Sequence, residues 1–261
     1  MKIYILSDFE GACAVVGRPG QTLTESQGGE RSSPSRSAWN AAVEGALAGG
    51  ATDIIVNDCH GGGLNLVYDE LHPEVRILLG APRPRRMLGL DSSFAGVFLI
   101  AYHSMAGTQN GVLAHSYSSR SVQHMWLNGT EIGEIGMDAA LAGSLGVPVL
   151  LVTSDRAGAE EAHSILGENI RTVAVKEGLG RNSAISLHPA RAQALIREAA
   201  EDAVHHAQEM KPLVFEPPYR HRRELKLESS VDAIMRSGKP NVTRIDSRTI
   251  ETVADDIFTV I

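Results

Sequence analysis

The sequence contains very little cysteine, with only Cys13 and Cys59 among 261 residues. Two cysteines are too few for a disulfide framework, so a reducing compartment, the cytoplasm, is expected. Cys59 stands beside His60 and could act as a thiol nucleophile, but a cysteine at the end of a buried strand is more often an inert core residue. The cysteines therefore favour neither a disulfide scaffold nor thiol chemistry.

Long hydrophobic runs and excess positive charge are also missing. No window approaches the roughly 18 apolar residues of a membrane-spanning helix. The N-terminus meets acidic side chains too soon to form the apolar segment of a signal peptide. The 24 Lys and Arg residues against 31 Asp and Glu give a formal net charge of -7, so no general attraction to nucleic acid or anionic lipid is expected. These absences favour a protein that acts on small molecules or peptides, without nucleic-acid or membrane partners.

Short apolar runs alternate with longer segments of helical character, which is typical of an α/β fold. The apolar runs that predict strands are residues 3–6, 53–57, 96–102, 147–153 and 171–176. The segments that predict helices are residues 35–47, 133–145 and 189–210, and glycines follow the first two. The sequence therefore predicts the α/β class, as a three-layer sandwich with a mixed, largely parallel sheet.

The alternation breaks up after Pro212, where two prolines and a basic run, Arg220 to Arg223, follow. We expect a catalytic α/β domain over residues 1–210 and a smaller C-terminal α+β subdomain over 211–261. The basic run is expected to be a solvated face or a subunit contact. Asn128-Gly129 between two strand-like segments predicts a tight hairpin, and the segment rich in Gly, Ser and Pro at 17–37 predicts a surface loop.

Three of the predicted strands are each followed by side chains that bind metals. Asp8 and Glu10 follow the first strand, His60 the second and His103 the third. Ligands of open α/β sheets collect beyond the carboxyl ends of the strands, so these residues are expected at one site. A divalent cation would offset the repulsion between the two carboxylates, and the added histidines favour zinc, with manganese or cobalt as alternatives. Taken singly, each residue has a structural alternative: an N-cap or surface role for the acids, a buried structural histidine for His60.

Several ordered motifs carry a resemblance to a known family. They are Asp8-Phe9-Glu10-Gly11, Asn57-Asp58-Cys59-His60, the apolar run from Gly96 to His103, Gly111 to Ser116, and Gly133-Glu134-Ile135-Gly136. In the same order they resemble motifs of the zinc-dependent D-aminopeptidases of the dipeptide-transport type, peptidase family M55. The family's serine position is Leu6 here, whereas Ser7 directly precedes Asp8. The resemblance runs from residue 1 to about 210 and is loose beyond it.

This resemblance implies a centre of two zinc ions in which Asp8 bridges the metals. Glu10, His60, His103 and Glu134 would complete the ligand set, and His115 would be the catalytic histidine. The resemblance also implies a ring-shaped homo-oligomer, with a decamer as the expected form. Its internal chamber would admit short peptides. Asp58, Asp155, Arg181 and Asn182 are further candidates for substrate contacts or for orienting the ligands, with a structural hydrogen bond as the alternative for each.

The predicted function is a zinc-dependent aminopeptidase that hydrolyses the N-terminal amide bond of short peptides, D-amino-acid peptides among them. One alternative is a metal-dependent phosphatase-like hydrolase, because two metals also suit phosphoryl transfer. No arginine-rich or glycine-rich phosphate cradle is evident, which disfavours it. The other alternative is a non-catalytic peptide-binding accessory protein, for which loss of a ligand or of the catalytic histidine is expected; Glu134 and His115 are both present.

Overall fold

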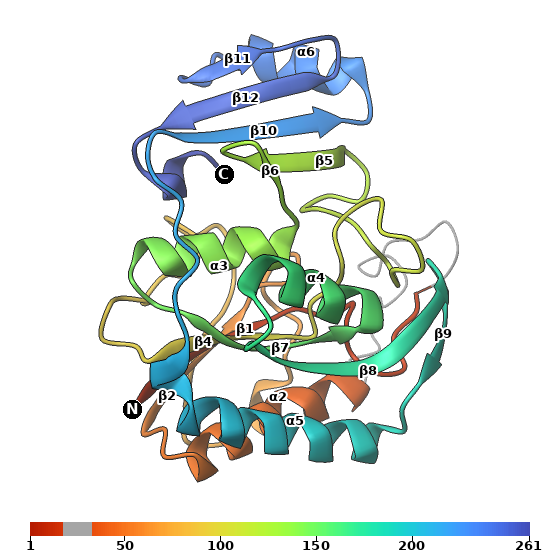
Figure 1. The fold of residues 1–261 in the computed structure, drawn as a ribbon. Helices are drawn as coiled ribbons and strands as arrows, with labels where there is room; N and C mark the ends of the chain where they lie inside the picture. Colours follow the sequence, from red (N-terminus) through yellow and green to blue (C-terminus); the bar gives the residue numbers. More distant parts are fainter. Residues whose placement is uncertain (18–32) are drawn as a thin grey trace.

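The computed structural model describes residues 1–17 and 33–261, and its main feature is a seven-stranded sheet (Figure 1). The strand order is β3-β2-β1-β4-β7-β8-β9, and all neighbouring strands are parallel except β8 and β9. The strands are β1 (Lys2–Ser7), β2 (Asp53–Asp58), β3 (Val75–Leu78), β4 (Gly96–Ile100), β7 (Val149–Asp155), β8 (Arg171–Gly180) and β9 (Ser183–Ser186). The predicted surface loop at 17–37 lies largely outside the described residues.

Helices cover both faces of this sheet. The helices α2 (Ser33–Ala48) and α5 (Pro189–His205) pack on one face, and α3 (Glu134–Ser144) and α4 (Arg156–Leu166) lie on the other (Figure 1). Alternate residues of β1 enter two separate cores, with Ile3 and Ile5 in the first and Tyr4 and Leu6 in the second, as the pleat of a strand requires. The predicted three-layer sandwich with a mixed, largely parallel sheet is confirmed.

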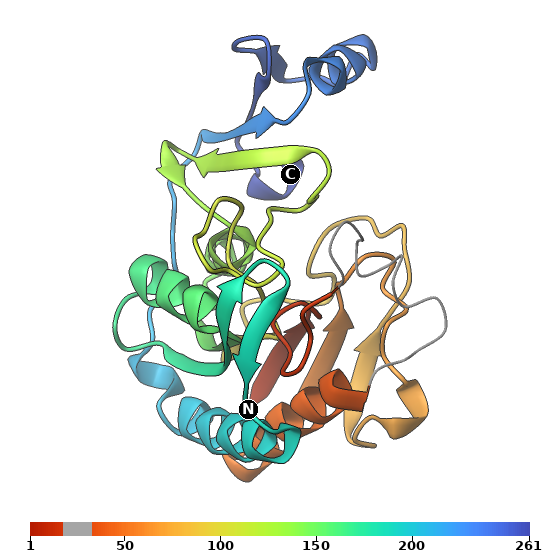
Figure 2. The ribbon, with the colours of Figure 1, turned by 90° about the vertical axis from the view of Figure 1, so that its right-hand side faces the viewer.

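A second, antiparallel sheet stands beyond α3 (Figures 1 and 2). Its strand order is β11-β12-β10-β5-β6. The strands are β5 (Val122–Leu127), β6 (Thr130–Glu131), β10 (Tyr219–Leu225), β11 (Val242–Arg244) and β12 (Thr249–Ala254), and α6 (Glu228–Arg236) accompanies them. This is the smaller C-terminal α+β unit, but it also takes β5 and β6 from the middle of the chain, so the division at residue 210 stays a prediction. Asn128 and Gly129 form the predicted hairpin turn, both with positive φ (48° and 87°).

Several element boundaries differ from those predicted. The strand predicted to reach Tyr102 ends at Ile100, because Ala101 adopts a left-handed backbone with φ 61°. The helix predicted to reach Met210 ends at His205 and gives way to a short 3-10 turn, Ala207–Glu209. Across residues 1–17 and 33–261, no helix combines the length and the apolar character needed to cross a membrane.

Candidate metal centre

The carboxyl ends of three adjacent strands bring the predicted ligands together. The strands β2, β1 and β4 are neighbours, and Ser7 at the end of β1 pairs with Asp58 on one side and Ile100 on the other. Asp8 and Glu10 follow β1, so they lie between the segments that carry His60 and His103. The parallel register thus gathers side chains that are far apart in the chain.

Asp8 lies between two histidines. Its Oδ1 is 3.1 Å from Nδ1 of His60, and its Oδ2 is 3.5 Å from Nε2 of His103. Glu10 Oε2 is 3.1 Å from the same nitrogen of His60. On the other side, Glu134 Oε1, from the first residue of α3, is 3.3 Å from Nε2 of His103. All five residues predicted as metal ligands therefore lie in one cluster, with Asp8 near its centre.

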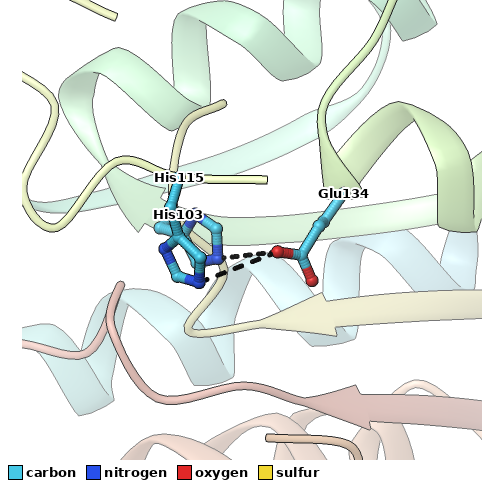
Figure 3. Close-up of side chains that lie close together, drawn as sticks. All are labelled: His103, His115 and Glu134. Carbon is cyan, nitrogen blue, oxygen red and sulfur yellow. Dashed lines mark ion pairs between the residues drawn. The ribbon is translucent and has the colours of Figure 1, made fainter. Parts of the chain in front are cut away.

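His115 reaches the same cluster from the loop that follows β4. Its ring stacks on that of His103, with centroids 3.9 Å apart and planes inclined by 13° (Figure 3). Its Nε2 is 3.9 Å from Glu134 Oε1 and 4.0 Å from Glu10 Oε1. The Nδ1 atom lies 2.8 Å from the carbonyl oxygen of Leu113, so the proton is assigned to Nδ1 and the Nε2 lone pair faces the carboxylates.

Burial makes this concentration of carboxylates costly without a cation. Asp8, Glu10 and Glu134 are at most 9% exposed. Nδ1 of His60 has one proton to donate, and it lies at the same distance from Asp8 Oδ1 and Glu10 Oε2. With that proton given to Asp8 Oδ1, the buried atoms Asp8 Oδ2 and Glu10 Oε2 accept no hydrogen bond from the described residues. Buried polar atoms in native proteins nearly always have a partner. The donor atoms of His103, His115 and Glu134 lie within 4.8 Å of one another, as do those of Asp8, Glu10 and His103. Nitrogen and oxygen donors at this spacing fit zinc.

The raised pKa values of Asp8 and His103 also indicate that the cluster is stabilised by added positive charge. Burial and the adjacent charge of Glu10 raise the pKa of Asp8 to about 7. Burial alone would lower the pKa of His103, but the carboxylates of Glu134, Asp8 and Glu10 outweigh it and raise this pKa to about 10. A divalent cation would supply the charge that the protons supply here.

Comparison with known proteins decides the family. A model of the D-aminopeptidase family, peptidase family M55, matches residues 1–261. The chain belongs to this family. A D-aminopeptidase of Bacillus subtilis (strain 168) is 35% identical over 226 residues, which cover 84% of this chain and 79% of that protein. The structure of the Zn-dependent D-aminopeptidase DppA from Bacillus subtilis, described as a self-compartmentalizing protease, matches with a TM-score of 0.87 at 29% identity, over 99% of this chain and 93% of that one. The resemblance seen in the motifs is confirmed, and with it the class of enzyme, a peptidase.

Two glycines of the D-aminopeptidase motifs are explained by close packing around the cluster. A Cβ at Gly11 would collide with the backbone carbonyl of Tyr102, and a Cβ at Gly133 would collide with the side chain of Glu161. Each glycine directly neighbours a predicted ligand, Glu10 or Glu134. The motif glycines therefore let the backbone approach closely enough to hold both carboxylates in the cluster.

The four further candidates make structural contacts. Asp58 is fully buried and accepts hydrogen bonds from the backbone of residues 65 and 66 in the loop after His60. Asp155 caps α4 through Gly158 N and also accepts from Val112 N. Arg181 donates to Ala114 O, and Asn182 donates to Val16 O. The bonds of Asp58 fix the loop after His60, those of Asp155 and Arg181 fix the loop of His115, and that of Asn182 fixes the segment after Glu10. No ion pair joins the four residues to the cluster within the described chain.

Lys176 is a residue of the site that was not predicted. It ends the apolar part of β8, is 3% exposed, and donates to three carbonyl oxygens, those of Glu10, Ala12 and Val15, at 2.5, 2.8 and 2.6 Å. Burial lowers its pKa to about 8. Its ammonium group thus holds the turn that places Glu10. A lone lysine at the end of an apolar strand was the only sequence signal.

Substitution of Lys176 by methionine should weaken zinc binding. The change leaves three carbonyl oxygens without their shared donor, and loss of a group that orients a metal ligand typically costs about 10- to 100-fold in affinity or activity. Zinc affinity measured by competition with a chelator should fall by about that factor, while the exposed Lys211→Met control keeps the wild-type value. An unchanged affinity in Lys176→Met would mean that the turn holds Glu10 without the ammonium group.

Proposed function

We propose that this chain is an aminopeptidase with a binuclear zinc centre that hydrolyses the N-terminal amide bond of short peptides, D-amino-acid peptides included. The observation that carries the proposal is the buried cluster of three carboxylates and three histidines, in which two carboxylate oxygens have no hydrogen-bond partner among residues 1–17 and 33–261. The likeness to the Zn-dependent D-aminopeptidase DppA supports it. The metal ligands would be Asp8, Glu10, His60, His103 and Glu134, with manganese or cobalt as possible substitutes for zinc.

The arrangement of the ligands suits a pair of cations. Asp8 presents one oxygen toward His60 and the other toward His103, which is the placement expected of a bridging carboxylate. His60 and Glu10 would hold one ion, and His103 and Glu134 the other. Bound zinc supplies a Lewis acid that lowers the pKa of water and polarises the scissile carbonyl.

His115 would transfer a proton from the attacking water to the departing amine. In the zinc-free protein, burial and the charge of the adjacent His103 lower the pKa of His115. A zinc ion held by His103 would replace that charge and likewise keep the His115 imidazole neutral. The bond from Nδ1 to Leu113 O fixes its orientation. Its Nε2 can then accept a proton as water is consumed and return it to the nitrogen of the departing amine, a task worth about 10²- to 10⁴-fold in rate.

The assembly would limit which substrates reach the site. DppA is described as self-compartmentalizing. We infer that this chain also forms a closed homo-oligomer in the cytoplasm, with a decameric ring as the expected form, and that short peptides are its substrates because a chamber excludes folded proteins.

An activity assay separates the proposal from its rivals. Zinc-loaded protein should release the N-terminal residue from D-alanyl and L-alanyl peptides, lose this activity on chelation, and regain it when zinc is returned. Hydrolysis of phosphate esters alone would favour the phosphatase-like alternative. Inactivity of every metal-loaded preparation, with retained peptide binding, would favour the accessory protein.

A further inference from the structure

A pocket of about 520 Å³ adjoins the candidate metal centre. Cys59 and Gly61, which line it, flank His60, and Tyr117 lies two residues beyond His115. The backbone N–H of Tyr117 donates to Glu134 Oε1 at 2.7 Å. The pocket is of the size that holds small ligands, and its wall is continuous with the segments that carry the predicted ligands.

Four arginines line this pocket and give it a positive character. Three of them come from the segment between β3 and β4, and the fourth comes from β10; they are Arg83, Arg85, Arg86 and Arg223. Of these four arginines, only Arg86 forms ion pairs within the described chain, with Asp138 and, at 3.8 Å, with Glu134. Arg83 donates to neutral oxygens, and Arg85 donates to Leu90 O and lies over the Phe258 ring at 4.9 Å. The positive charge therefore exceeds the carboxylate charge that contacts it.

Among the residues that the structure describes, Arg223 is the pocket arginine with an unsatisfied buried hydrogen-bond donor. Its buried Nε atom has no hydrogen-bond partner in the described part of the chain, and the same is true of the Tyr117 hydroxyl in the same pocket. Arg223 is only partly exposed, and a guanidinium group that is partly withdrawn from water without a counter-ion costs free energy. Both groups are donors, so an anion with oxygen acceptors would satisfy them together.

The neighbours of Arg223 on β10 show that this orientation is specific to it. Arg220 and Arg222 are exposed and pair with Glu251 at 3.2 and 3.1 Å, because alternate residues of a strand face opposite sides. The basic run is thus a solvated face only in part: Arg223 belongs to the other face, toward the pocket.

We propose that this pocket binds the C-terminal carboxylate of the peptide substrate, with Arg223 and the Tyr117 hydroxyl as its contacts. The inference rests on the proposed peptidase function. The terminal carboxylate is the anion chosen because every unmodified short peptide carries one. A peptide held by its carboxylate in the pocket would extend toward the adjacent cluster. The distance between the pocket and the metal cluster would then favour short substrates, in addition to any effect of the oligomer's chamber.

A matched pair of substrates tests this assignment. D-alanyl-D-alanine and its C-terminal amide release the same N-terminal residue and differ only in the anionic group. Wild-type enzyme should prefer the acid by at least about 10-fold in kcat/KM, mainly through KM, as expected for a charge-assisted hydrogen bond. In Arg223→Met this ratio should fall toward unity, whereas Arg222→Met, on the opposite face of the same strand, should keep it. Arg223→Lys, which retains the charge without the fork, should give an intermediate ratio.

The outcomes distinguish this inference from the proposed function. Equal cleavage of acid and amide by the wild type would uphold the peptidase and overturn the carboxylate site. If neither is cleaved, the peptidase fails, and calorimetric binding of the same two compounds decides the pocket: tighter binding of the acid that Arg223→Met abolishes upholds the site, and equal binding overturns it. Hydrolysis of a phosphate monoester that depends on Arg223 would assign the pocket to phosphate and overturn both.

Discussion

Replacing Asp8 with alanine is expected to remove the bound zinc and the peptidase activity together. Asp8 is the residue whose two oxygens face both His60 and His103, so its loss affects both proposed ion positions. The loss of activity should be larger than the loss caused by removing a residue that only orients a metal ligand, which is about 10- to 100-fold. Elemental analysis of the dialysed protein and the rate of D-alanine release measure the two effects.

Misfolding is separated from metal loss by Asp8→Asn, which preserves the shape of the side chain. Burial and the charge of Glu10 raise the pKa of Asp8 from 3.8 to about 7. The ionised carboxylate therefore destabilises the zinc-free fold, in full above pH 7 and progressively less as the pH falls from 7 toward 3.8. Asparagine carries no such charge. At pH 8 the zinc-free Asp8→Asn protein should unfold at the same temperature as zinc-free wild type or higher; a clearly lower temperature would indicate a structural role for Asp8 instead.

Replacing His115 with alanine should lower kcat by about 10²- to 10⁴-fold with little change in zinc content. The reason is that its Nε2 is 3.9 and 4.0 Å from the nearest carboxylate oxygens, farther than the corresponding nitrogen of His103, which suits a proton carrier beside the ligands. Single-turnover kinetics and metal analysis of the same preparation measure turnover and occupancy separately.

The alternative for His115 is a role as a ligand, because its donor atom belongs to a group within 4.8 Å of His103 and Glu134. In that case His115→Ala would lose zinc as well as turnover. Full turnover in His115→Ala would remove the residue from both roles.

The central layer of the fold was predictable because its strands are strongly apolar. The strands β1, β2, β4 and β7 are buried on both faces, and continuous apolar runs mark such strands. The edge strands β3 and β9 were missed, because their partly exposed residues form no such run. The composition of the second sheet was also beyond prediction, since it pairs β5 with β10 across a long stretch of chain.

The candidate ligands could be proposed from sequence because each follows a strand or starts a helix within a short motif. Lys176 and Arg223 could not, since their partners are distant in the chain: Lys176 contacts the carbonyl of Glu10, and Arg223 shares its pocket with Arg83 and Arg85. Arg83, Arg85 and Arg86 stand together in the sequence, as do the basic residues Arg220 to Arg223, but nothing in the sequence places these two groups at one pocket. Only the tertiary structure shows that Lys176 holds the turn that carries Glu10 and that Arg223 lines the pocket next to the cluster.

Anomalous diffraction at the zinc edge, on crystals of the zinc-loaded protein, would locate the ions relative to the cluster. We expect a pair of peaks within coordination distance of the cluster, with one carboxylate oxygen of Asp8 beside each and His60 and His103 on opposite sides. The absence of any peak among these side chains, or zinc bound only elsewhere on the protein, would contradict the proposed binuclear zinc centre.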